Sequence, residues 1–304
     1  MATGGTSSLA VVGPGASSNE ELAQIERQYE TYRRSKRTFN ILFWGGFAVC
    51  VVISAIVAKF DVLVLIKGMP RTTEFLVKMI PPIGFATFAH DMGEWYWGFG
   101  KWMNSLLNTL LMAYLATVLG TAIGGFFSFF AARNLVKHHA TYWITRRALE
   151  IARTVPDIVW ALLFVLAFGI GPLPGVLAIT VHTIGAQGKL FAEVNENVNM
   201  LPVEGVRSVG GNWYEEIRFG VLPQVLPSFM SYTFWRVELN VRSATIVGFV
   251  GAGGIGHDLF TSVQLLYFAD AGAILLIVIA TIMLIDMASE KYRHLVIGKD
   301  SLGS

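Results

Sequence analysis

The sequence is short of charged residues and of cysteine. Only 14% of its 304 residues are charged, whereas about 25% are charged in an ordinary soluble domain. The formal net charge of +2 does not provide the basic surface that nucleic-acid binding requires, so we expect no nucleic-acid partner. Cys50 is the single cysteine, which excludes an intramolecular disulfide framework. Hydrophobic residues make up 54% of the chain and the mean hydropathy is +0.55, as is typical of a membrane protein.

The sequence also lacks the motifs of nucleotide and metal chemistry. The run Gly251-Ala-Gly253-Gly254-Ile-Gly256 matches the glycine spacing of a dinucleotide site. It follows an apolar segment, however, and not the strand of a βαβ unit that such a site needs. The run 185–190 has its glycines too close together for a phosphate-binding loop and lacks the Ser or Thr of that loop. Metal-ligand clusters and catalytic triad spacings are absent from the sequence as well, so we expect neither a cofactor in this chain nor enzymatic activity.

The hydrophobic residues gather into six segments that predict transmembrane helices. The first holds about 20 apolar residues, enough to cross about 30 Å of hydrocarbon. The expected spans are residues 39–58, 104–132, 155–170, 176–191, 224–250 and 271–288. The sequence therefore predicts an all-α membrane protein with six transmembrane helices.

Charges beside the spans predict their orientation. The first span follows the basic residues Arg33, Arg34, Lys36 and Arg37, and such residues favour the cytoplasmic side. Six spans then place both termini in the cytoplasm. The basic segment 133–153 is expected to be a cytoplasmic loop, and segments 59–101 and 251–268 are expected to be external. The chain is thus divided into a tail (1–38), a first helix with an external segment (39–101), a core (102–293) and a C-terminal tail (294–304).

One polar stretch inside the core, residues 201–223, predicts two short helices with a sharp bend between them. Pro202 suits the first turn of a helix, and Asn212 with Glu215 forms a capping-box pattern that begins a second helix. The residues expected to end these helices are, in chain order, Gly210, Gly211, Gly220 and Pro223. A bent helix pair at a membrane surface can dock into a groove on another protein.

This stretch resembles the EAA loop of ABC-importer permeases. The first triplet of that pattern falls on Glu204, Gly205 and Val206, its glycine on Gly210, and its end on Leu222-Pro223. Gly205 and Val206 replace the two alanines of the pattern, and Gly220 replaces its isoleucine. The surrounding sequence resembles the phosphonate branch of these permeases. It reads VEGVRSVGGNWYEEIRFGVLPQVLP, followed by RVELNVRSATIVGFVGAGGIG. The resemblance covers about residues 102–293.

The resemblance implies a five-helix permease core, to which residues 39–58 add an extra N-terminal helix. It implies the inner membrane of a prokaryote, a second permease copy, two ATPase subunits that bind ATP and Mg, and an external substrate-binding protein. The run with Gly251, Gly253, Gly254 and Gly256 would then be an external gate or a contact for the binding protein. The residues that the resemblance assigns to ATPase coupling are Glu204, Gly205, Arg207, Gly210, Leu222 and Pro223.

Polar residues inside the expected spans are candidates for a substrate path, because charge within hydrocarbon is costly and faces a bundle interior or water. Helical spacing pairs Glu238 with Arg242 and Arg236 with Asn240. Two interpretations are open: an internal ion pair that orients helices, or an arginine that attracts an anion. A histidine in such a span equally fits a packing role. The candidate path residues are His182, Thr183, Arg236, Glu238, Asn240, Arg242 and Ser243.

The resemblance favours a permease that moves phosphonate or a related phosphorus oxyanion, such as phosphite or phosphate. A permease for methionine or for an osmoprotectant is the alternative within transport. A membrane-embedded enzyme or an ion-coupled carrier is an alternative from another class. The bent polar stretch argues against both of these, since neither needs an element that docks to an ATPase.

Overall fold

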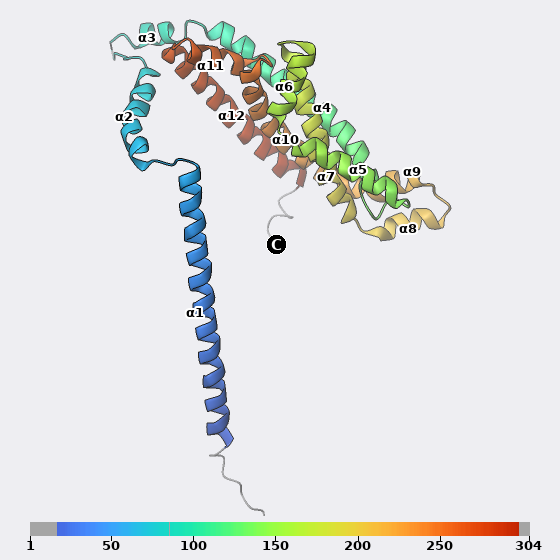
Figure 1. Cartoon of the computed structure of the whole chain (residues 1–304). Coiled ribbons are helices and arrows are strands. Elements are labelled where there is room, and N and C mark those ends of the chain that lie inside the picture. The colour runs from blue at the N-terminus through green and yellow to red at the C-terminus, as the bar shows by residue number, and fades with distance from the viewer. Residues whose placement is uncertain (1–16, 85, 298–304) are drawn as a thin grey trace, which may run out of the picture. The chain divides into compact units, whose positions relative to one another are not determined.

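The structure is a computed structural model that describes residues 17–84 and 86–297, with side chains described for residues 27–84 and 86–291. Helices and turns form this part of the chain, and it contains no strand (Figure 1). The prediction of an all-α protein is confirmed. Most of the expected tail 1–38 belongs to the first helix from Ser17 onwards, whereas residues 1–16 and 298–304 of the two expected tails lie outside the described residues.

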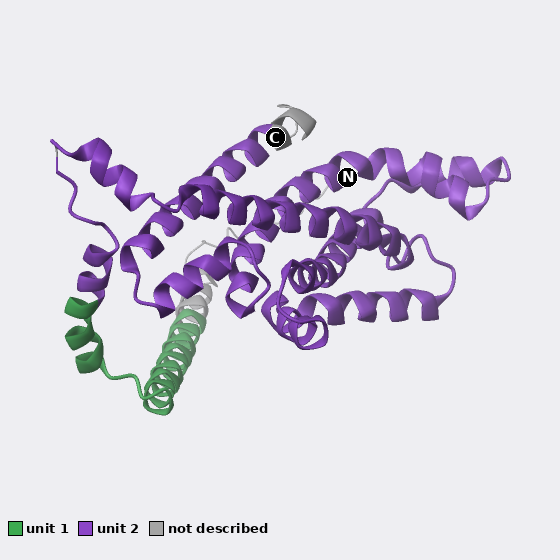
Figure 2. Ribbon diagram, turned by 90° about the horizontal axis from the view of Figure 1, so that it is seen from above, with its two compact units in different colours: residues 1–71 green, residues 72–304 purple. Residues whose placement is uncertain are grey.

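The chain divides into two compact units, residues 1–71 and 72–304 (Figure 2). The first unit contains α1 (Ser17–Val57) and the start of α2 (Val62–Lys78). From Arg27 to Val57, α1 is long and apolar enough to cross a membrane, in agreement with the first expected span. Its large apolar side chains are exposed, as Trp44 is at 62%, which suits a helix whose surroundings are lipid.

The second unit contains the permease-like core. A long helix, α4 (Phe99–Phe130), follows the short α3 (Phe88–Trp95) and begins five residues before the expected span at 104. The remaining elements are α5 (His139–Thr154), α6 (Asp157–Phe168), α7 (Pro172–Glu196), α8 (Met200–Ser208), α9 (Trp213–Glu215), the π-helix η1 (Glu216–Val221), α10 (Leu222–Val247), the 3-10 turn η2 (Gly248–Val250), α11 (Ile255–Gln264) and α12 (Phe268–Ile297).

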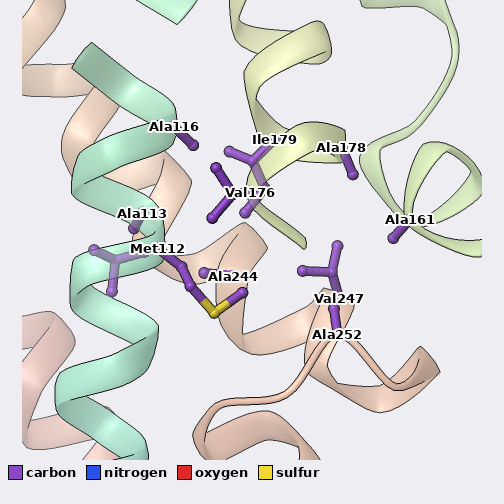
Figure 3. Close-up of a cluster of buried hydrophobic side chains, with 11 residues drawn as sticks. Met112, Ala113, Ala116, Ala161, Val176, Ala178, Ile179, Ala244, Val247 and Ala252 are labelled. Carbon is purple, nitrogen blue, oxygen red and sulfur yellow. The ribbon is translucent and has the colours of Figure 1, made fainter. Parts of the chain in front are cut away.

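Small side chains let these helices approach closely. Figure 3 shows a buried cluster that includes Ala113 and Ala116 of α4, Ala178 of α7 and Ala244 of α10. The backbones of α4 and α7 come still closer, because a Cβ atom at Gly124 would lie 2.8 Å from the carbonyl oxygen of Ile184. Such contacts give dispersion energy between helices without large apolar side chains. The core is therefore a tight assembly of α4, α6, α7 and α10.

Most of the expected loop 133–153 forms the helix α5, and its position on the cytoplasmic side stays a prediction. Ile144, Ala148 and Ile151 lie at helical spacing on one side of this segment, so it is an amphipathic helix and not an irregular loop. The third span is shorter than expected: α6 has 12 residues, about 18 Å of helix. Before Pro156 the chain turns extended, as a following proline favours, and α5 and α6 meet at 86°.

The count of six spans stays a prediction. In the described residues, the stretches Arg27–Val57, Phe99–Phe130 and Phe268–Lys291 are long and apolar enough to cross a membrane. Two bent pairs of helices, 139–168 and 213–264, raise the number to five if each is one span. The helix that corresponds to the fourth expected span, α7, is not among these, and it carries Lys189, Glu193 and Glu196 in its second half.

Candidate functional site

Residues 200–221 comprise α8, α9 and η1 and are called here the bent segment. The chain leaves the helical core at the start of this segment and returns to the same place at its end. Gln224 joins its two ends: its Oε1 accepts from the Asn199 amide at 3.1 Å, and its Nε2 donates to the Asn199 carbonyl at 3.0 Å. The Asn199 side chain also caps α8 by accepting from the amide of Leu201. These bonds fix where the chain leaves the end of α7 and where it re-enters α10.

The bend lies where the sequence places it. Gly210 has a φ of +87°, a left-handed conformation that glycine adopts without steric cost. The capping box is present as well: Asn212 Oδ1 accepts from the amide of Glu215 at 3.1 Å, and Glu215 Oε2 accepts from the amide of Asn212 at 2.7 Å. Both predictions are confirmed.

An ion pair joins the two arms of the bent segment. Nε and Nη2 of Arg207 donate to the two carboxylate oxygens of Glu216 at 2.8 and 2.9 Å. This hydrogen bonding lowers the pKa of Glu216, which is 8% exposed. The sequence analysis includes Arg207 but misses Glu216, since nine positions separate them and no helical spacing links them before the bend is known.

The second short helix does not end at Gly220 and Pro223, and this expectation is wrong. Instead, α9 continues through η1 directly into α10, where Pro223 occupies the first turn. Gly220 is buried because it touches α8: a Cβ atom there would lie 2.9 Å from Cα of Val203. Gly220 therefore serves close packing between the arms of the bent segment and not helix termination.

The outer face of the bent segment is open to a partner. Glu204 and Gly205 are exposed, and so are apolar side chains of which Val209 at 87% and Tyr214 at 62% are examples. On the opposite face, Trp213 anchors the segment by donating from Nε1 to the Leu135 carbonyl at 2.9 Å. The arrangement presents polar and apolar side chains on a supported, protruding element.

A second group of polar side chains lies within the helices. Nη2 of Arg236 lies 2.8 Å from Nδ1 of His182, and Arg236 is 7% exposed. The expected pairing of Arg236 with Asn240 is wrong: Asn240 Nδ2 donates to Thr117 Oγ1 at 2.8 Å and to Thr183 Oγ1 at 3.0 Å. Because α10 packs between α4 and α7, the partners of both side chains come from other helices.

The predicted ion pair between Glu238 and Arg242 is confirmed. The Glu238 side chain is 8% exposed and that of Arg242 is 45% exposed, so the pair reaches from the interior of the helix assembly to its surface. Ser243 follows Arg242 on α10 and is half-buried, and its hydroxyl makes no hydrogen bond within the described residues. The structure thus brings His182, Thr183, Arg236 and Asn240 together and leaves Arg242 and Ser243 nearer the surface.

The glycine run after α10 forms a closely packed turn. Gly251, Gly253 and Gly254 all have positive φ angles. A Cβ atom at Gly254 would lie 2.4 Å from Thr109 Oγ1, and one at Gly256 would lie 1.8 Å from the Thr245 carbonyl oxygen. These contacts favour a fixed turn between α10 and α11, and the role of these glycines as a gate or as a contact for another protein stays a prediction.

Comparison with known proteins agrees with this geometry. Residues 124–290 match the family described as binding-protein-dependent transport system inner membrane component. The phosphite transport system permease protein PtxC of Stutzerimonas stutzeri is 34% identical over 247 residues, which are 81% of this chain and 86% of that protein. The putative cryptic phosphonate transport system permease protein PhnE2 of Escherichia coli K12 is 46% identical over 117 residues, which are 38% of this chain and 96% of that protein.

The fold also resembles a solved transporter. The structure described as inward-facing conformations of the MetNI methionine ABC transporter aligns with a TM-score of 0.56 at 18% identity, covering 66% of this chain and 96% of that chain. At this identity the likeness concerns the fold alone. The match over residues 124–290 and the likeness to PtxC show that this chain belongs to the binding-protein-dependent inner membrane components, the permease subunits of ABC importers.

Proposed function

We propose that this permease moves phosphite, phosphonate or a related phosphorus oxyanion, such as phosphate, into the cell. The observation that carries the proposal is the likeness, over four fifths of the chain, to a permease named for phosphite transport. The shorter likeness to a permease named for phosphonate transport points to the same class of anion. The methionine transporter, by contrast, is similar in fold alone.

The charge of Arg236 supports an anionic substrate. Its side chain is buried, and no carboxylate among the described residues lies within ion-pair distance of it. Its Nε atom is buried without a hydrogen-bond partner in the same part of the chain. An unpaired cation in a low-dielectric place is unfavourable, and a passing oxyanion would compensate it. His182 lies beside Arg236, and we assign Thr183 and Asn240, which hydrogen-bond to each other, to the same polar path through α7 and α10.

The bent segment supports coupling to an ATPase on the cytoplasmic side. We assign Glu204, Gly205, Arg207, Gly210, Leu222 and Pro223 to this role, with Glu216 as the residue that holds Arg207. The exposed apolar side chains of the segment suit a protein groove. In this assignment both chain termini are cytoplasmic, two permease copies assemble with two ATPase subunits that carry ATP and Mg, and an external binding protein delivers the anion.

Uptake measurements test the substrate class. The permease is expressed with its ATPase and binding protein in cells that lack their own uptake of phosphorus oxyanions. We expect ATP-dependent uptake of phosphite or methylphosphonate, and no uptake of methionine or glycine betaine. Uptake of methionine or glycine betaine, without uptake of any phosphorus oxyanion, would establish the alternative and overturn this proposal.

A further inference from the structure

A polar pocket lies beside the bent segment and is not explained by transport. Its volume is about 620 Å³, and it is lined by Arg133, Asn134, Tyr142, Arg146 and Glu196. We call it the Arg133 pocket. Its residues come from the turn that follows α4, from α5 and from the end of α7, which meet near α8 and α9 in Figure 1. The pocket is distinct from the group around Arg236.

Hydrogen bonds arrange the walls of the Arg133 pocket. Glu196 Oε1 accepts from the Arg133 amide at 3.0 Å and from Arg146 Nη1 at 2.9 Å. Arg146 Nη1 also donates to the Tyr142 hydroxyl at 2.9 Å. The guanidinium of Arg133 makes no hydrogen bond or ion pair within the described residues. Two arginines against one glutamate leave the pocket with one net positive charge.

The unused groups define the chemistry of a ligand. The free fork of Arg133 matches two oxygens of a tetrahedral oxyanion. Glu196 is a hydrogen-bond acceptor, and its side chain is 28% exposed, so it can accept a hydrogen bond from a ligand in the pocket. A group that offers both oxygens and a P–O–H proton, such as hydrogen phosphate, satisfies the two requirements together, whereas sulfate at neutral pH offers no proton.

The Arg133 pocket touches the bent segment directly. Asn134 Nδ2 contacts Met200 Sδ, at the start of α8, at 3.6 Å. The next residue, Leu135, accepts the Trp213 hydrogen bond at the start of α9. The Trp213 ring also packs on Phe130 at the end of α4, with 5.1 Å between ring centroids. A ligand that orders residues 133–135 would therefore order both arms of the bent segment.

We propose that the Arg133 pocket binds a phosphate group, either of a free anion or of a lipid headgroup at the membrane surface, and that binding stiffens the bent segment. The inference does not rest on the proposed substrate, because the pocket lies outside the polar path. Its affinity is modest, since Glu196 and the carboxyl ends of α4 and α7 oppose an anion.

Calorimetric titration of the purified full-length chain with inorganic phosphate, at constant ionic strength, tests this inference. We expect saturable binding that weakens at least tenfold in Arg133→Gln and that is weaker still for sulfate. Lys137→Gln is the matched control, because it removes a neighbouring positive charge that does not line the pocket, and its affinity should stay within about twofold of the unaltered chain. The same titration on Arg236→Gln separates this pocket from the proposed substrate path, and binding there should persist.

Two further arms identify the source of the phosphate group and its effect. Phosphatidylglycerol is added before the titration. If it abolishes the heat of phosphate binding in the unaltered chain and has no effect in Arg133→Gln, the pocket is assigned to a lipid headgroup. Hydrogen exchange of residues 200–221 should slow when the pocket is filled. Equal losses in Arg133→Gln and Lys137→Gln, or the absence of Arg133-dependent binding of either phosphate source, would overturn the inference.

Discussion

The guanidinium of Arg236 donates to a histidine and not to an acid: Nη2 lies 2.8 Å from Nδ1 of His182. Because a guanidinium has no lone pair to accept with, Nδ1 must be the accepting atom, and the imidazole is neutral with its proton on Nε2. The hydrogen bond to a neutral partner therefore leaves the positive charge of Arg236 available to an anion, although Asp157 acts on this charge from beyond ion-pair distance.

Replacement of Arg236 by Gln should reduce anion uptake while protein level and association with the ATPase stay normal. A hydrogen bond to a charged group contributes about 1.5–3 kcal/mol, so we expect uptake to fall about ten- to a hundredfold. Lys101→Gln removes a positive charge that is exposed at the start of α4 and is the control. Normal uptake by Arg236→Gln would leave Arg236 with the role of orienting helices.

The pair of Glu238 and Arg242 should behave as a structural unit. Loss of one partner of a buried ion pair costs about 3–5 kcal/mol, and we expect the lower end of this range because the Arg242 side chain is 45% exposed. Glu238→Gln should therefore accumulate poorly in membranes, and the double change Glu238→Gln with Arg242→Gln should recover. Quantified membrane levels of the three variants check this, and a double variant as unstable as the single one would contradict it.

Gly210→Gln should uncouple ATP hydrolysis from uptake or prevent assembly with the ATPase. The φ of +87° at Gly210 costs a residue with a side chain about 1–2 kcal/mol, so the bend would open. Gly100→Ala, at the start of α4 and outside the bent segment, is the control, because the added Cβ meets nothing within 4 Å and alanine favours the helix. In Gly210→Gln the measured uptake rate should fall relative to the ATPase rate, whereas the control should keep the ratio of the two rates. Normal uptake by Gly210→Gln would show that the bend does not serve coupling.

The bent segment should loosen in acid. Arg207 lowers the pKa of Glu216 from its ordinary value of 4.5, so the ion pair stabilises the segment fully above that pH and less as the pH falls through the lowered value. The hydrogen-exchange protection of residues 200–221, corrected for the intrinsic exchange rate at each pH, should fall below about pH 4.5. Glu216→Gln should exchange faster at neutral pH and lose this pH dependence. An acid response that persists in Glu216→Gln would assign it to another group.

The glycine run and the bent segment should face opposite sides of the membrane. Because Cys50 is exposed, the test uses a Cys50→Ala background with single cysteines at Gln264 on α11 or Ser208 on α8, both exposed positions. In intact cells an impermeant thiol reagent should label Gln264→Cys and not Ser208→Cys. The reverse pattern would invert the orientation and remove the assignment of the bent segment to the ATPase.

Local signals made part of the site predictable. Gly210, the Asn212–Glu215 capping box and the Glu238–Arg242 pair each depend on residues within one turn of chain, and the sequence identifies all three. The helix α5 could also have been predicted, since its apolar residues follow helical spacing. The basic charge of this segment indicates a loop instead.

Contacts between distant residues account for what the sequence could not predict. Arg236 and His182 are 54 positions apart, and Trp213 meets the Leu135 carbonyl across 78 positions. Spacing along α10 allows Arg236 to meet Asn240, yet the two side chains find partners on other helices. The choice between these arrangements depends on how closely α4, α7 and α10 pack, which glycines such as Gly124 permit but do not specify.

The π-turn of η1 makes the number of residues between α9 and α10 as important as the identity of those residues. A π-helix holds one residue more in each hydrogen-bonded ring than an α-helix, and η1 joins the bent segment to α10 without a break. Deletion of a single residue between Glu216 and Val221 would let the chain relax to a continuous α-helix. The residues of η1 would then change position, and the ion pair of Glu216 with Arg207 and the packing of Gly220 on Val203 would be lost. Insertions and deletions in these six residues should thus be far less tolerated in evolution than substitutions of their side chains.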